Sequence, residues 1–337
     1  MDRANNEAGT DHAALAAVAE LYHRWLTGLL LMVISRRGAG PAAELVFRLF
    51  RRQQLEKFLP GLEKLGLRAL PDAVACAQYH YLSNALGGVK VEWIPETDRK
   101  SWVRYLPPRW IFDGTAVCGI PTEVSRAMLW GWHAHNGVSL GNDRLGFVCT
   151  MQTTDGQPGL EGYYVEEDQP LAPEDRVRFR PGERPPNEPV DLPKPAWDPL
   201  RLVKVERNYA TAYIRSILPE LCAVLGPADA GAVGAIAARQ IGMQYHGAVM
   251  ALLRHEASFA ERFARLLRAH GDEVEVSGDT VQCGRCTLLD DLALPPEAFD
   301  AWNGLWEGLA AMEGRALVLA HRRDRGDDCY SWRVSGP

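Results

Sequence analysis

The sequence predicts an α+β fold of two pseudo-repeated lobes, each a helical bundle packed on a small antiparallel sheet. Helical periodicity and strand alternation follow one another twice in the same order: three helices, a hairpin, a helix and two strands. The stretches "QYHYLSNALGGVKVEW" (Gln78–Trp93) and "FARLLRAHGDEVEV" (Phe263–Val276) both pass from a helix through glycine into an alternating strand. Nine prolines between Asp168 and Pro199 separate the two halves. We therefore expect an internal duplication.

Bulk composition narrows the class of protein. The 337 residues are 47% hydrophobic and 24% charged, which is typical of soluble globular proteins. A net charge of −6 without a basic stretch argues against nucleic acid as a partner. The longest uncharged apolar run near the start, Trp25–Ser35, is shorter than the roughly 20 residues that a bilayer requires, and the polar, acidic residues before it do not resemble a secretory signal. Seven scattered cysteines favour a reducing compartment, so we expect a cytoplasmic protein without a membrane partner.

The first lobe is expected to span residues 1–167. Apolar periodicity, with Gly and Pro breaks, predicts helices over 12–34, 41–58 and from Pro71, and a fourth over 121–132. In "VKVEW" the apolar and charged residues alternate, which predicts a strand with "SWVRYL" as its hairpin partner. Two more strands are predicted at "RLGFVCT" and "EGYYVEE".

Residues 168–199 are expected to form a proline-rich connector without regular structure, because proline lacks a backbone donor. A connector of this length that is ordered should wrap around one lobe. The second lobe, 200–337, then repeats the pattern. It contains a helix from about Leu202 to Leu225, two further helices, a hairpin at Gly278-Asp279, a helix in "PPEAFDAWNGLWEGLAAMEG", and the strands "ALVLAHR" and "CYSWRV".

The second lobe also resembles a known family. The motifs "VQCGRC", with Arg285-Cys286, and "GDDCYSWRV" are similar to those of the L-2-amino-thiazoline-4-carboxylic acid hydrolase family. The resemblance covers roughly residues 205–335 and more faintly 15–167, and 4-vinyl-reductase-type ligand-binding domains have a related plan. It implies hydrolytic opening of a small ring that contains sulfur and nitrogen. This chain departs from the pattern by being doubled, and its first half lacks the paired cysteines. If those cysteines take part in the chemistry, the resemblance implies that only the second half is catalytic.

Three cysteines and one histidine of the second half are candidate catalytic residues. Cys283 and Cys286 form a C-x-x-C at a strand end, which suits a redox pair, half of a zinc site, a nucleophile with its neighbour, or buried structural thiols. Cys329 and His321 would complete a Cys₃His set if the last strands lie beside the hairpin. Alternation places His321 on the same face as Leu317 and Leu319, so we expect it to point inward. A His–Cys pair there would generate a thiolate in a hydrolase, or would be a satisfied core histidine in an inert domain.

The apolar helix "GAVGAIAARQIGMQYHGAVMALL" carries candidate substrate-binding residues. Arg239 and His246 are seven residues apart and share one face, with Gln240 and Gln244 beside it. Burying an arginine without an anion is costly, so its partner is expected to be a protein carboxylate or the carboxylate of an amino-acid-like ligand. In the second case Arg239 holds the substrate and His246 is a second candidate for activating water or Cys329.

The first half contains a histidine cluster in "LWGWHAHNG". His133 and His135 with Glu161 are candidate ligands of a divalent metal such as zinc, although neighbours two apart on a regular helix do not share a face. Trp132 and Tyr163 nearby suggest an aromatic-lined substrate cavity, with an aromatic core as the ordinary alternative.

These residues lead to a hypothesis about function. We expect a hydrolase that opens a non-peptide C–N bond in a small cyclic heterocycle bearing a carboxylate, such as a thiazoline or cyclic amidine, without a cofactor. The alternatives are a non-catalytic small-molecule sensor, and a metal-dependent enzyme built on His133, His135 and Glu161. The expected partner is a small molecule bound where the two halves meet, and a homodimer is an option because terminal strands often pair with a second chain.

Overall fold

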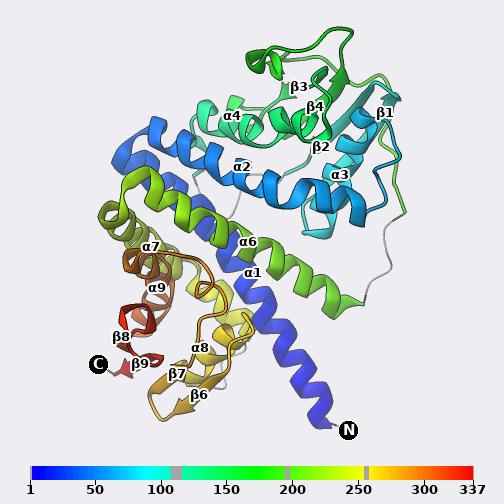
Figure 1. The fold of residues 1–337 in the computed structure, drawn as a ribbon. Coiled ribbons are helices and arrows are strands. Elements are labelled where there is room, and N and C mark those ends of the chain that lie inside the picture. Colours follow the sequence, from blue (N-terminus) through cyan, green and yellow to red (C-terminus); the bar gives the residue numbers. More distant parts are fainter. Residues whose placement is uncertain (1, 108–115, 194–197, 254–257, 337) are drawn as a thin grey trace. The chain divides into compact units, whose positions relative to one another are not determined.

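The computed structural model describes residues 2–107, 116–193, 198–253 and 258–336, with side chains from residue 12 onward. It has a mixed α+β architecture with a five-stranded and a four-stranded sheet, which confirms the predicted class. The chain forms two compact units: Arg37–Trp197 is one, and Met1–Arg36 together with Asp198–Pro337 is the other (Figure 1). These boundaries differ from the expected lobes at 1–167 and 200–337, because the first helix belongs with the C-terminal half.

The unit formed by residues 37–197 contains the five-stranded sheet. Its strands lie in the order β1-β2-β4-β3-β5, with antiparallel pairs except for β5, which is parallel to β3. The elements are α2 (Ala39–Lys64), α3 (Asp72–Leu86), β1 (Val91–Thr97), β2 (Lys100–Tyr105), η1 (Val117–Gly119), α4 (Thr122–Gly131), η2 (His133–His135), α5 (Asn136–Leu140), β3 (Leu145–Met151), η3 (Thr153–Asp155), β4 (Leu160–Glu166), η4 (Pro173–Asp175) and β5 (Val177–Phe179).

The proline-rich connector follows the sheet of this unit, as expected of an ordered segment. The amide of Val190 donates to the carbonyl of Trp93 (2.9 Å), and the amide side chain of Asn187 donates to the carbonyl of Pro95 (2.7 Å). The expectation that the connector has no regular structure was wrong at β5, where Val177 and Phe179 alternate with arginines between prolines. Residues 194–197 of the connector lie outside the described residues.

The unit formed by residues 1–36 and 198–337 contains the four-stranded sheet. All its strand pairs are antiparallel, in the order β6-β7-β9-β8. The elements are α1 (Asp2–Arg37), α6 (Pro199–Leu225), α7 (Pro227–Leu253), α8 (Phe259–Arg268), β6 (Val274–Ser277), β7 (Thr280–Cys283), α9 (Pro296–Ala311), β8 (Ala316–His321), η5 (Arg323–Arg325) and β9 (Tyr330–Ser335).

Helix α1 is part of the interior of this second unit. The ring nitrogen of Trp302 donates to the hydroxyl of Tyr22 (2.8 Å), and that hydroxyl lies 2.7 Å from Nε2 of His270. The helix His12–Arg37 is long and apolar enough to cross a membrane by length and composition, but 67% of its most apolar window is buried within the protein. Packing against the C-terminal half therefore accounts for its apolar character.

The four-stranded sheet has one covered and one open face. Helices α8 and α9 pack on the covered face, where Val281, Cys283 and Trp332 are buried. The alternate residues of the strands, including Gln282 and Arg333, are exposed on the outer face. An antiparallel sheet tolerates this arrangement because its side chains alternate between the two faces. The outer face holds the candidate site.

Candidate functional site

An open pocket of about 650 Å³ lies on the outer face of the four-stranded sheet. Three strands and the loop between β8 and β9 contribute its lining, which consists of Thr280, Gln282, Ala320, His321, Gly326, Asp327, Asp328, Cys329, Ser331 and Arg333. Two of the predicted catalytic residues, Cys329 and His321, therefore line the same pocket.

Strand pairing explains how the side chains meet. Ser331 on β9 is the register partner of Gln282 on β7 and of His321 on β8, so the three form a row across the sheet. Cys329 lies directly before β9, where its Sγ accepts from the amide nitrogen of Gln282. It lines the same pocket as His321.

The expectation that His321 points inward with Leu317 and Leu319 was wrong. The register of β8 against β9 shifts between Leu319 and His321, so a β-bulge inserts one extra residue. A bulge interrupts the alternation of side chains. Leu317 stays buried, whereas His321 turns to the outer face with 60% of its side chain exposed. The same bulge brings His321 to the face that carries Cys329.

The groups around Cys329 have complementary roles. The amide nitrogen of Gln282 donates to Sγ of Cys329 (3.2 Å), and Cys329 is half-buried. Nδ1 of His321 lies 3.8 Å from the carboxylate of Asp327. Arg333 adds a guanidinium to the same pocket. A thiol, an imidazole with a carboxylate behind it, an amide donor and a cation together suit nucleophilic attack on a small anionic substrate.

Cys283 and Cys286 are separated from this pocket. Both are free thiols with exposures of 2% and 1%, and Cys283 lies on the covered face of the sheet. Burial, followed by the charges of Asp272 and Asp290, raises the pKa of Cys283 to about 12. Burial likewise raises the pKa of Cys286 well above its usual value. Thiols that stay protonated are poor nucleophiles and metal ligands, so the interpretation as structural thiols is favoured over the redox, zinc and catalytic ones.

The predicted substrate-binding face of α7 lies elsewhere. Arg239 is 54% exposed, and its guanidinium pairs with Glu307 on α9 (3.1 Å). His246 contacts Glu313 (3.0 Å), which also pairs with Arg262. Gln240 and Gln244 are exposed on the same helix. The carboxylate partners of Arg239 and His246 thus come from the protein, and neither residue lines the Cys329 pocket.

The histidine cluster of the first half is not arranged as a metal site. His133 is buried and its Nδ1 lies 2.6 Å from the hydroxyl of Tyr164, whereas Nδ1 of His135 bonds the carbonyl of Trp130 (3.0 Å). Glu161 is fully buried and forms an ion pair with Arg104. Across the described parts of the chain, no three His, Cys, Asp or Glu side chains are grouped so that they could hold a metal ion. The three predicted ligands are therefore not brought together.

Trp132 and Tyr163 belong to separate packed groups. Tyr163 lies in a buried cluster with Ile94, Trp102 and Val148, and burial, followed by its hydrogen bond to Glu183, raises its pKa to about 12. Trp132 instead packs edge-on to His80, at a ring distance of 5.8 Å. The structure therefore favours an aromatic core over an aromatic-lined cavity at these positions.

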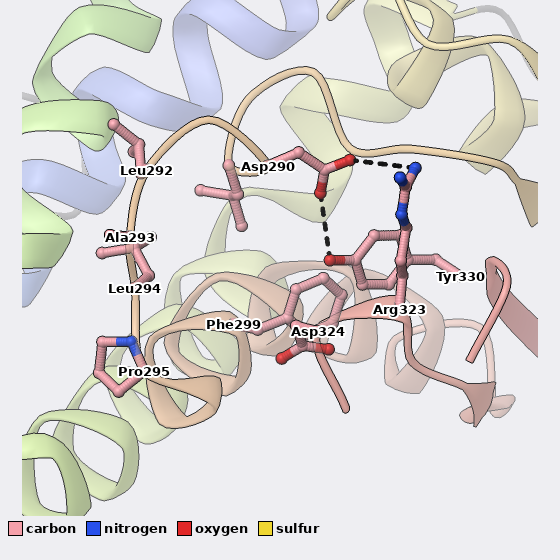
Figure 2. A pocket seen from close by; sticks show the side chains of 10 residues that line it. Asp290, Leu292, Ala293, Leu294, Pro295, Phe299, Arg323, Asp324 and Tyr330 are labelled. Carbon is pink, nitrogen blue, oxygen red and sulfur yellow. Dashed lines mark hydrogen bonds and ion pairs between the residues drawn. The ribbon is translucent and has the colours of Figure 1, made fainter. Parts of the chain in front are cut away.

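A second pocket of about 290 Å³ lies where the loop before α9 faces the start of β9. Figure 2 shows Asp290 between Arg323 and Tyr330: its carboxylate accepts from the Tyr330 hydroxyl (3.2 Å) and lies 3.7 Å from the guanidinium. The loop residues Leu292–Pro295 and the ring of Phe299 supply apolar walls. The lining of this pocket contains neither cysteine nor histidine, and its charged or titratable side chains are those of Asp290, Arg323, Asp324 and Tyr330.

Several residues of the Cys329 pocket were absent from the sequence prediction. Alternation along "CYSWRV" places Cys329, Ser331 and Arg333 on one face, so the last two could have been inferred. Gln282 and Asp327 depend on the pairing of β7 with β9 and on the loop after β8, which no local pattern reveals.

Comparisons with known proteins do not assign the chain to a family. The chain matches no family model, no curated protein and no solved structure. The function must therefore be argued from the pocket.

Proposed function

We propose that the protein is a hydrolase that opens a C–N bond in a small cyclic heterocycle carrying a carboxylate, such as a thiazoline or cyclic amidine. The observation that supports this proposal is the shared pocket of Cys329, His321, Asp327 and Arg333. The choice of substrate class comes from the resemblance of "GDDCYSWRV", which contains Cys329 and Arg333, to the L-2-amino-thiazoline-4-carboxylic acid hydrolases.

Cys329 acts as the nucleophile in the proposed reaction. His321 accepts the thiol proton, and the thiolate adds to the ring carbon that bears the nitrogen. The ring C–N bond then breaks, and the nitrogen leaves with the proton from His321. Water adds to the resulting thioester-like carbon and gives a proton to His321. The C–S bond breaks and Cys329 recovers that proton, so the net change is the addition of one water molecule.

The other pocket residues hold and stabilise the reacting groups. Gln282 already donates to Sγ of Cys329 (3.2 Å), so its amide stabilises the thiolate. Asp327 lies 3.8 Å from Nδ1 of His321, where its carboxylate offsets the positive charge that His321 gains in the reaction. Arg333 replaces Arg239 as the residue that holds the substrate carboxylate, because Arg333 lines the pocket and Arg239 pairs with Glu307.

We also infer that the two units are pseudo-repeats. The first four strands of one sheet lie in the order β1-β2-β4-β3 and those of the other in the order β6-β7-β9-β8. In each sheet a helix, α4 or α9, separates the second strand from the third, and it packs on α2 or α7 respectively. A shared order of this kind supports duplication of one ancestral module.

Turnover by variants tests the catalytic proposal. A panel of cyclic amidines, thiazolines and hydantoins is incubated with the protein, and ring opening is read as a mass gain of one water. We expect Cys329→Ala and His321→Ala to lower the rate at least 100-fold. Cys118→Ala is the matched control, because Cys118 is exposed and belongs to the other unit. Full activity of both pocket variants on a substrate that the wild-type protein opens would refute the mechanism.

A sensor is the second candidate function. The pocket of Figure 2 favours it, since its apolar walls lie beside an Asp290 carboxylate that is already paired with Tyr330 and Arg323. A ligand that raises the melting temperature and is recovered unchanged after prolonged incubation would support the sensor. Consumption of that ligand would exclude it.

A further inference from the structure

A third pocket, of about 490 Å³, lies beside the turn that joins α8 to β6. Its lining comes from three separate segments and consists of Gly271, Glu273, Gly284, Arg285, Thr287 and Arg323. It contains none of the cysteines and histidines of the proposed hydrolase, so it is a different site from the Cys329 pocket.

Opposite charges face this pocket without meeting. Glu273 and Arg285 both line it and both are exposed. Among the described residues neither forms an ion pair within 4.0 Å, although the charge of Arg285 acts on the carboxyl groups of Asp272 and Asp291. Opposite charges attract, and these two line one concave site without forming an ion pair with each other. A molecule that carries both charges can bridge them.

A second guanidinium strengthens the positive side. Arg323 lines the same pocket, and its Nη1 donates to the carbonyl of Gly284 (2.7 Å), which holds the side chain in place. Arg323 is only partly neutralised by Asp290, at 3.7 Å. Guanidinium groups bind carboxylates through paired N–H donors, and two guanidinium groups and one carboxylate, that of Glu273, line this pocket.

We propose that this pocket binds a small zwitterion, namely a free α-amino acid. Its carboxylate lies against Arg285 and Arg323, and its ammonium group lies against Glu273. Gly271 and Gly284 have no side chains, which leaves the ligand room to approach the backbone. A volume of about 490 Å³ leaves room for a side chain on the ligand.

Titration of the full chain with L-alanine tests this proposal, with the backbone amides of Gly271 and Gly284 observed by ¹⁵N NMR. We expect both amides to shift saturably. Arg285→Gln and Glu273→Gln should each weaken binding at least tenfold. The matched controls Arg325→Gln and Glu275→Gln, which are exposed residues outside the pocket, should stay within twofold. Amide signals outside the pocket that match those of the wild-type protein would show that each variant is folded.

Ligand analogues separate a zwitterion site from a simpler one. N-acetyl-alanine lacks the ammonium group and ethylamine lacks the carboxylate, so each should bind at least tenfold more weakly than L-alanine. Saturable shifts with inorganic phosphate but not with L-alanine would overturn the proposal in favour of an oxyanion site. Equal binding to the Glu273→Gln variant would overturn it as well. L-alanine should bind equally well to the Cys329→Ala variant, because Cys329 does not line this pocket. The zwitterion site can therefore be tested even if the hydrolase proposal fails.

Discussion

His270 is held as a neutral acceptor in the interior of the unit formed by residues 1–36 and 198–337. Its Nε2 lies 2.7 Å from the hydroxyl of Tyr22, which accepts from the ring nitrogen of Trp302. The tyrosine proton is then free to point at Nε2, which requires that this nitrogen carries no proton. Burial, followed by the positive charge of Arg207, lowers the pKa of His270 to about 3.

This histidine predicts a pH dependence of stability. The unfolded chain protonates His270 near pH 6.5 and the folded chain only near pH 3, so the unfolded state binds more protons between these values. The free energy of unfolding should therefore decrease as the pH is lowered from about 6.5 to about 3, by up to about 1.4 kcal/mol per pH unit. The measurement is amide exchange in α8 and α9 at pH 7 and pH 4. We expect wild-type protein to lose about 3 kcal/mol more than His270→Gln. Equal losses would contradict this role.

At the scale of single residues, His321 and Arg239 show what could not be predicted from the sequence. Cys329 and His321 were both predicted as site residues from residue type, and both line one pocket, but the direction of His321 was not foreseen. Strand alternation gives its direction only while the register is unbroken, and the bulge after Leu319 is set by the pairing of β8 with β9. Similarly, an apolar helix with one arginine predicted burial of Arg239, whereas close packing of glycines on α7 leaves that arginine exposed beside Glu307.

Helices α7 and α9 approach each other through glycine. A Cβ atom added to Gly242 would collide with the carbonyl of Leu305, and one added to Gly308 would collide with the carbonyl of Arg239. Gly234 of α7 lies against Ala301 of α9, and Gly242, further along α7, lies against Leu305, further along α9. The two helices therefore run parallel. Small residues let helix backbones approach this closely, which explains the glycines in an otherwise ideal apolar helix.

The helix pair provides a matched test. Gly242→Ala should destabilise the unit by about 2 kcal/mol or more, because backbone atoms would have to move to accept the methyl group. Gly247→Ala, on the same helix, meets nothing within 4 Å and should stabilise it by up to about 1 kcal/mol through helix propensity. Urea denaturation of both variants measures the difference. Similar effects of the two substitutions would show that the helices are not in glycine contact.

At the scale of elements, sequence patterns located most helices and strands. Long periodic segments such as α6, and hairpins such as the one at Gly278-Asp279, carry their own start and stop signals. The strand β5 was missed because three residues between prolines do not form a pattern, and its pairing with β3 supplies the hydrogen bonds. Short elements such as β5 therefore form because of their tertiary pairing and cannot be recognised from local sequence patterns.

At the scale of the whole molecule, one unit is built from two separate segments of the chain, and the other unit is inserted between them. Residues 1–36 belong with residues 198–337, and residues 37–197 form the intervening unit. Tyr22 meets Trp302 and His270, and the guanidinium of Arg24 lies 4.6 Å from the ring centre of Tyr245. Local sequence patterns do not reveal which half a helix joins, so the expected boundary at residue 167 followed the order of the chain.

This arrangement predicts how fragments behave. Residues 37–197 should fold cooperatively alone, since their contacts form a self-contained unit. Residues 198–337 should fold poorly alone, because removing α1 exposes Trp302 and His270 and loses buried aromatic contacts worth roughly 1.5–3 kcal/mol for each large side chain. A peptide of residues 1–36 added in trans should restore cooperative unfolding, read by circular dichroism. Stable folding of 198–337 without the peptide would contradict the assignment of α1.

The most direct test of the proposed function is whether a substrate from the ring-opening panel becomes attached to Cys329. Acid quenching during turnover, followed by mass mapping of the peptides, should reveal the substrate mass on the peptide that contains Cys329. The His321→Ala variant should accumulate this adduct more slowly, and the Cys329→Ala variant should show none while remaining folded. Ring opening by wild-type protein without an adduct on Cys329, together with undiminished turnover by Cys329→Ala, would contradict the account.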